Sequence, residues 1–157
     1  MNVTRILDIR QLKGISDYQF SPEITDILFK NMEQIELKKS KNTGKIRYLY
    51  EKDELLLTLR PTNGLFTLGF LAANKIVNNF APPVMRAIVL TEISEFIKEG
   101  RNVFCKHVVD IDEDLRPMDE VIVVNEQDVI LAIGRVKIPV PYIKDFNRGV
   151  AIDVRKG

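Results

Sequence analysis

Residues 120–137 read EVIVVNEQDVILAIGRVK, two runs rich in valine and isoleucine on either side of a polar stretch at 126–128. β-branched residues favour strands because their side chains pack well on a pleated surface. Glu126-Gln127-Asp128 has the composition of a short connection between two strands. This segment therefore predicts a β-hairpin.

The residues around the hairpin extend this pattern into a compact unit. A helix at 92–98 is expected to be capped by Thr91, with Ser94 as a second possible cap, and to end before Gly100. One helix among several short, turn-bounded strands is typical of a small barrel. The other elements expected here are strands at 85–90, 103–111 and 150–155, and a turn with a short helix at 139–146.

The first part of the chain has a separate set of elements. Apolar residues in 1–20 have helical spacing, with Gly14 as the expected end of that helix. A second helix is expected to begin at Ser21-Pro22-Glu23, where Ser21 can cap and Pro22 lacks an N–H that a helix start does not need. Strands are then expected at 35–37, 45–50, 55–60 and 66–68, followed by a helix at 71–79.

Pro82-Pro83 marks the expected boundary between the two parts, because neither proline can continue a helix. We predict an α+β protein of two small domains. The first, at 1–81, is expected to be a sandwich-like α/β domain, and the second, at 84–157, a pseudo-barrel.

Composition places the chain among ordinary globular proteins, with 45% hydrophobic and 29% charged residues and a net charge of +1. Any nucleic-acid site must therefore rest on local clustering of charge. Cys105 is the one cysteine, so no internal disulfide can form, and a reducing, cytoplasmic setting is expected. No run of about 20 apolar residues is present, so no association with a membrane is expected.

Few residues are suited to catalysis. Cys105 and His107 alternate in an expected strand and would face the same side, which allows either a nucleophile pair or a packed thiol beside an imidazole. We favour the packed thiol. One cysteine and one histidine cannot supply a four-ligand zinc site, and no glycine-rich phosphate loop is present. The acidic run at 110–120 is interpreted as a solvated loop, and no catalytic centre, metal or cofactor is expected.

Local clusters of basic and aromatic residues point to RNA. Basic side chains meet phosphates, and aromatic rings stack on unpaired bases. One cluster is the hairpin at 38–47, with Tyr48 and Tyr50 beside it; a charged surface hairpin is the alternative. Gly134 and Gly149 would let an RNA approach the main chain closely, unless they serve turn or bulge geometry. The second cluster consists of Arg135, Lys137, Lys144, Arg148, Arg155 and Lys156, with Tyr142 and Phe146 among them.

Four segments of the second half resemble an archaeal PUA domain, an RNA-binding barrel, in order and spacing. Met118 stands where that family usually has a glycine, in a turn before a strand. The matching segments are Gly100–Phe104, Leu115–Val121, Ala132–Arg135 and Phe146–Arg155.

Three segments of the first half are similar to the C2 domain that precedes PUA in archaeal tRNA-guanine transglycosylase, the enzyme of archaeosine formation. They are Asp17–Phe20, Thr43–Arg47 and Thr58–Leu68. In that family the chemistry belongs to a separate TIM-barrel domain with an aspartate nucleophile and a zinc site, and nothing in this sequence resembles it. The resemblance thus implies only the part of the enzyme that handles tRNA.

The family's PUA module grips the acceptor end of tRNA, and its C2 domain helps to hold the D-arm. Carried onto this sequence, the resemblance implies contacts in both halves. Those in the second half are Phe104, Lys106, Gly134, Arg135, Lys137, Arg148 and Gly149, and those in the first half are Lys45, Arg47 and Arg60.

The resulting hypothesis is a tRNA-binding protein without a catalytic centre, which acts as the small subunit of a split transglycosylase with a separate catalytic chain. The alternative is a ribosome- or translation-associated PUA protein. An enzyme centred on Cys105 and His107 is the third and least favoured hypothesis. The sequence does not define an oligomeric state.

Overall fold

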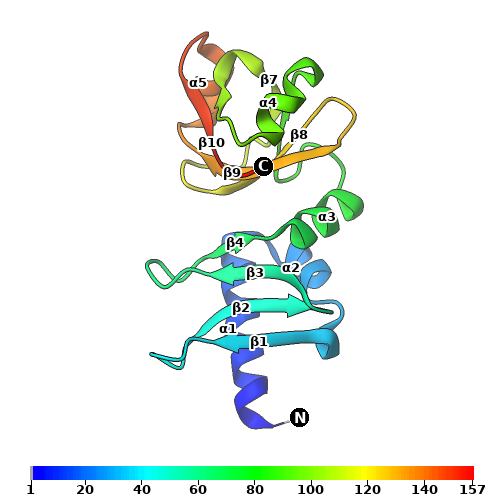
Figure 1. Cartoon of the computed structure of the whole chain (residues 1–157), viewed down its shortest axis with the longest axis vertical. Helices are drawn as coiled ribbons and strands as arrows, with labels where there is room; N and C mark the ends of the chain where they lie inside the picture. Colours follow the sequence, from blue (N-terminus) through cyan, green and yellow to red (C-terminus); the bar gives the residue numbers. More distant parts are fainter. Residues whose placement is uncertain (1) are drawn as a thin grey trace. The chain divides into compact units, whose positions relative to one another are not determined.

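The computed structural model describes residues 2–157 and confirms a mixed α+β fold. The chain divides into two compact units, Met1–Asn79 and Phe80–Gly157 (Figure 1). The domain boundary expected after residue 81 stays a prediction. In the structure Phe80 belongs to the second unit, and its carbonyl oxygen accepts a hydrogen bond from Arg86 of that unit.

The first unit begins with two helices, α1 (Val3–Gln19) and α2 (Pro22–Leu28). Ser21 caps α2 as expected, since its hydroxyl accepts from the N–H of Ile24. The expected end of α1 at Gly14 is wrong, since the helix continues for five more residues. Leu12 and Ser16 are fully buried on either side of Gly14, and this packing outweighs the cost of about 1 kcal/mol of a glycine within a helix.

A four-stranded antiparallel sheet of order β1-β2-β3-β4 forms the other layer of the first unit. Helix α3 (Phe70–Asn79) follows it and packs on β3 and β4, and α1 runs behind the strands in Figure 1. The turn from β2 to β3 places Lys52 and Asp53 at positive φ. The strands are β1 (Ile35–Lys39), β2 (Ile46–Glu51), β3 (Glu54–Leu59) and β4 (Phe66–Leu68), with a 3₁₀ turn, Met32–Gln34, before β1.

The second unit is built on a six-stranded sheet of order β6-β10-β9-β8-β5-β7. The predicted hairpin at its centre is confirmed: β8 (Glu120–Val124) pairs antiparallel with β9 (Ile130–Val136). All five residues of β8 are buried, as expected for a strand covered on both faces. The remaining strands are β5 (Arg86–Val89), β6 (Val103–Phe104), β7 (Val108–Ile111) and β10 (Val150–Lys156).

Two helices accompany this sheet, α4 (Ser94–Lys98) and α5 (Val140–Asp145). The predicted cap at Thr91 is wrong, because a 3₁₀ turn, Thr91–Ile93, precedes α4. The Thr91 hydroxyl instead donates to the side chain of Gln127 and accepts from the N–H of Glu126. The residue that sequence alone treats as a local cap therefore ties the helix region to the β8–β9 turn.

The single strand predicted at 103–111 is also wrong. A 3₁₀ turn, Cys105–His107, separates β6 from β7, because β6 pairs with β10 whereas β7 pairs with β5 on the other edge of the sheet. Consecutive residues of a 3₁₀ turn are rotated by about 120°, so Cys105 and His107 do not share a face.

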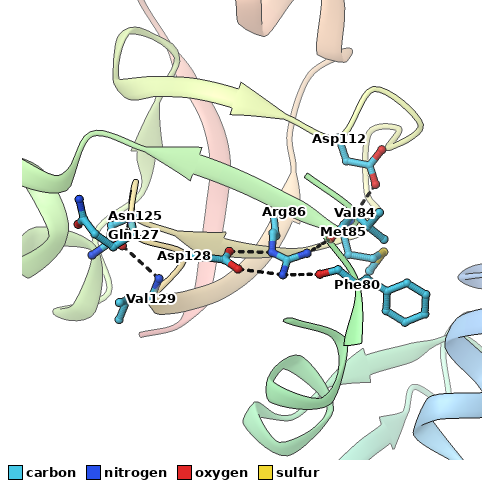
Figure 2. Close-up of polar contacts among 9 residues, drawn as sticks. All are labelled: Phe80, Val84, Met85, Arg86, Asp112, Asn125, Gln127, Asp128 and Val129. Carbon is cyan, nitrogen blue, oxygen red and sulfur yellow. Dashed lines mark hydrogen bonds and ion pairs between the residues drawn. The ribbon is translucent and has the colours of Figure 1, made fainter. Parts of the chain in front are cut away.

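Arg86 anchors the start of the second unit, as Figure 2 shows. Its side chain is fully buried and binds the Asp128 carboxylate and the carbonyl oxygens of Phe80 and Val84. Met85, the residue before Arg86, is held by Asp112, whose carboxylate accepts a hydrogen bond from the Met85 N–H. The segment that leads into the sheet is thus fixed by charge-assisted hydrogen bonds.

Candidate nucleic-acid interface

A shallow groove of about 680 Å³ lies where α5 leads into β10. Its lining is mostly apolar and carries the cations Lys137 and Arg148. Lys137 is half exposed and lies 3.8 Å from Asp153, an exposed pair that solvent screens strongly. Arg148 is exposed and forms no ion pair within residues 2–157, so its charge is available to an anionic ligand.

The loop at 147–149 forms one wall of this groove. Gly149 has φ +94°, a left-handed conformation that side chains other than glycine adopt at a cost, and the space beside its Cα is open. Its carbonyl oxygen accepts from the N–H of Cys105, which fixes the loop against the end of β6. Gly149 therefore serves the geometry of the turn, which was one of the two roles expected for it. The main chain at this point is also open to a ligand.

Phe104 and Lys106 lie beside this loop. Phe104 is 45% exposed and pairs with Val150 across the β6–β10 ladder, and Lys106 is exposed in the 3₁₀ turn that follows. The Phe104 ring meets His107 edge to face at 6.3 Å. Five of the seven residues expected in this half, Phe104, Lys106, Lys137, Arg148 and Gly149, thus lie on the segments that meet around the start of β10.

Gly134 lies apart from these five residues around the start of β10. It is buried opposite Val154, and a Cβ at this position would lie 2.4 Å from the carbonyl oxygen of Asp153. Its missing side chain is explained by the close approach of β10, so the expected contact between Gly134 and RNA is not supported by its position.

Arg135 is half-buried on the next rung of the sheet, opposite Glu120 on one side and Asp153 on the other. Its Nε lies 3.9 Å from the buried carboxylate of Glu120, which also binds Arg155. A buried carboxylate needs cationic partners, so Arg135 has a structural task beside any contact with RNA.

The three residues expected in the first half do converge. Lys45, Arg47 and Arg60 line one cleft of about 780 Å³ between α1 and the loops at the ends of the sheet. Lys39 and Asp8 also line it and form an ion pair at 3.4 Å. The lining also includes polar residues and glycines, together with the apolar residues Ile15, Ile46, Leu59 and Pro61.

Positive charge in this cleft exceeds negative charge. Lys45 and Arg47 form no ion pair within residues 2–157. The Nε of Arg47 is buried without a hydrogen-bond partner among these described residues, while its guanidinium lies 5.6 Å from the centre of the Tyr48 ring. Uncompensated cations in a concave site attract phosphate groups.

No catalytic arrangement is found at Cys105 and His107. Burial raises the pKa of the Cys105 thiol, which disfavours the reactive thiolate.

Within residues 2–157, no group of three or more His, Cys, Asp and Glu side chains is placed to hold a metal ion. No helix of this described part is long and apolar enough to cross a membrane.

Family models match both halves of the chain. Residues 10–83 match the patch-forming domain C2 of tRNA-guanine transglycosylase, and residues 85–157 match the PUA domain. The two halves of the chain thus match, in order, the C2 domain of that enzyme and a PUA domain.

Two curated relatives that match nearly the whole chain are both tRNA-guanine transglycosylases. The chain is 35% identical over 154 residues to a tRNA-guanine(15) transglycosylase of Methanothermobacter thermautotrophicus, covering 98% of this chain and 23% of that protein. It is 39% identical over 150 residues to the enzyme of the same name from Methanobrevibacter smithii, covering 96% and 22%. The chain therefore corresponds to the C2 plus PUA region of tRNA-guanine(15) transglycosylases and spans about a quarter of their length.

Solved structures agree with the fold. A hypothetical protein of Pyrococcus horikoshii OT3 superposes with a TM-score of 0.75 at 22% identity, covering 95% of this chain and 89% of that one. A PUA domain protein of Thermoplasma acidophilum gives a TM-score of 0.65 at 15% identity, covering 94% and 89%. At these identities the similarity concerns the fold alone.

Proposed function

We propose that this protein binds tRNA and serves as the RNA-binding, non-catalytic part of a tRNA-guanine transglycosylase, as the small subunit of a split archaeosine enzyme. The observation that carries the proposal is the match of both halves, in order, to the C2 and PUA domains of that enzyme. The relatives are named for a reaction on tRNA, and the matched region is about a quarter of each of them.

Two basic surfaces support binding of a polyanion. The barrel surface is defined by Phe104, Lys106, Lys137, Arg148 and Gly149, and the cleft surface by Lys45, Arg47 and Arg60. Cations on such surfaces release counterions from the nucleic acid, so affinity should fall steeply with salt. The C2 match favours a transglycosylase role over the alternative of a ribosome-associated protein.

Binding is tested by measuring the affinity for tRNA of the double variant Lys137→Ala/Arg148→Ala. Loss of two phosphate contacts should weaken binding and lower the slope of log K against log salt by roughly two. Lys98→Ala is the matched control, because Lys98 is exposed in the same unit but lies outside both surfaces. Equal affinities of the double variant and the control would rule out the barrel surface as the site.

The subunit role is tested by mixing the protein with a separately encoded catalytic transglycosylase chain and measuring guanine exchange into tRNA. Stimulation of exchange by the wild-type protein, and not by Lys137→Ala/Arg148→Ala, is expected. Co-sedimentation with ribosomal subunits and no stimulation would contradict the role and favour the alternative.

A further inference from the structure

Tyr142 and Phe146 form a stacked aromatic pair on the surface of the second unit. Their rings are nearly parallel, at 6°, with centroids 5.5 Å apart, and the side chains are 52% and 48% exposed. The pair is set by the backbone, since the N–H of Phe146 donates to the carbonyl oxygen of Tyr142 at the end of α5. Half-exposed rings held in this way contribute little to a core and present flat apolar surface to solvent.

Phe146 also lines the shallow groove at the start of β10, together with Lys137 and Arg148. Asn147 lies between the ring and Arg148, and neither Asn147 nor Arg148 donates a main-chain hydrogen bond within residues 2–157. One short segment therefore presents an aromatic face, an unpaired cation and two available N–H groups. An unpaired nucleotide offers the complementary set, a flat base with hydrogen-bonding edges next to a phosphate.

We propose that Phe146 is a stacking platform for one unpaired base of the bound RNA, with Tyr142 holding its ring in place and Arg148 binding the adjacent phosphate. The inference rests on the proposed RNA-binding function and adds to it a requirement for an unpaired nucleotide at this groove. A protein segment is the rival occupant. Asp153 lies 3.8 Å from Lys137 and Asp145 also lines the groove, but Arg148 is exposed and forms no ion pair within residues 2–157, which favours the polyanion.

Affinity for two RNAs tests the platform: tRNA, which has unpaired bases, and a blunt RNA duplex, which has none. Phe146→Ala should weaken tRNA binding roughly tenfold, because removing one stacked base contact has about that effect, and should leave duplex binding unchanged. Phe146→Tyr should keep the wild-type affinity, and Phe146→Leu, which is apolar but not aromatic, should behave like Phe146→Ala.

Phe96→Ala is the matched control, because Phe96 is 52% exposed in the same unit but does not line the groove. Thermal melting of each variant establishes that it is folded. A second readout uses RNA with 2-aminopurine at one unpaired position at a time. At one of these positions the wild-type protein should change the fluorescence, and Phe146→Ala should not.

The outcomes separate this inference from the proposed function. If the wild-type protein binds neither RNA, the proposed function fails and the platform fails with it. If the wild type binds tRNA and Phe146→Ala binds it equally well, the function stands and the platform is wrong. Equal weakening of tRNA and duplex binding by Phe146→Ala would also overturn the platform.

Discussion

The fully buried guanidinium of Arg86 binds both carboxylate oxygens of Asp128, with Nε–Oδ1 at 2.8 Å and Nη2–Oδ2 at 3.0 Å (Figure 2). The two residues are 42 positions apart, and the contact joins the first strand of the second unit to the turn between β8 and β9. Asp128 itself has φ +61°, which an aspartate tolerates better than most residues.

Asp128→Asn should destabilise the second unit strongly, because it leaves the buried charge of Arg86 without its anionic partner. Removing one member of such a pair costs about 3 kcal/mol or more. The Lys98–Glu95 pair is the matched control, since it is exposed and 3.7 Å apart, and Glu95→Ala should change stability by less than about 0.5 kcal/mol. Urea unfolding measures both, and similar values for the two variants would contradict the structural role of Arg86.

Met118→Gly should stabilise the protein. Met118 has φ +77° and a side chain that is 63% exposed, so it carries the strain of a left-handed conformation with little packing in return. Relief of that strain, less the entropy cost of glycine, amounts to about 0.5–1 kcal/mol. Met118→Ala keeps the Cβ and should give no gain. A higher melting temperature for Met118→Gly alone is the expected result.

The Cys105 thiol should be unreactive in the folded protein. It is buried, and burial raises its pKa, so the thiolate is scarce at neutral pH. A thiol reagent such as DTNB should modify Cys105 at the rate of unfolding and rapidly in denaturant. Rapid modification of the native protein at pH 7 would instead revive the hypothesis of a nucleophilic cysteine.

Lys45→Ala/Arg47→Ala should weaken the salt dependence of tRNA binding. If both cations of the cleft contact phosphates, the slope of log K against log salt concentration should fall by about two in the double variant. Lys30→Ala is the control, because Lys30 is exposed in the same unit and does not line the cleft. An unchanged slope for the double variant would show that the cleft does not meet RNA, whatever the barrel surface does.

Local sequence patterns predicted those parts of the fold that depend on neighbouring residues. The hairpin at 120–137 and the Ser21 cap follow from strand propensity and from a hydroxyl at a helix start, and both are confirmed. The break at Cys105–His107 was missed, because it depends on which edges of the sheet β6 and β7 join. Arg86 was missed for the same reason, since its partner Asp128 is distant in sequence.

The candidate sites show a similar division. Lys45, Arg47 and Arg60 were chosen for their charge and for the resemblance to C2, and the structure brings them to one cleft. Gly134 was chosen for its missing side chain and Arg135 for its charge, both with the resemblance to PUA, yet Gly134 is packed against the neighbouring strand β10 and Arg135 lies 3.9 Å from Glu120. Sequence indicates which residues can meet RNA, but only the pairing of strands shows which of them are already engaged.

The most direct test of the central claim compares the affinity of the wild-type protein for intact tRNA and for the same tRNA without its single-stranded 3′ CCA end, over a series of salt concentrations. We predict strong salt dependence for both RNAs and clearly weaker binding of the shortened one, since the unpaired end should lie on the barrel surface. Equal affinity for the two RNAs would contradict the assignment of that surface, and the absence of binding to either would contradict the function.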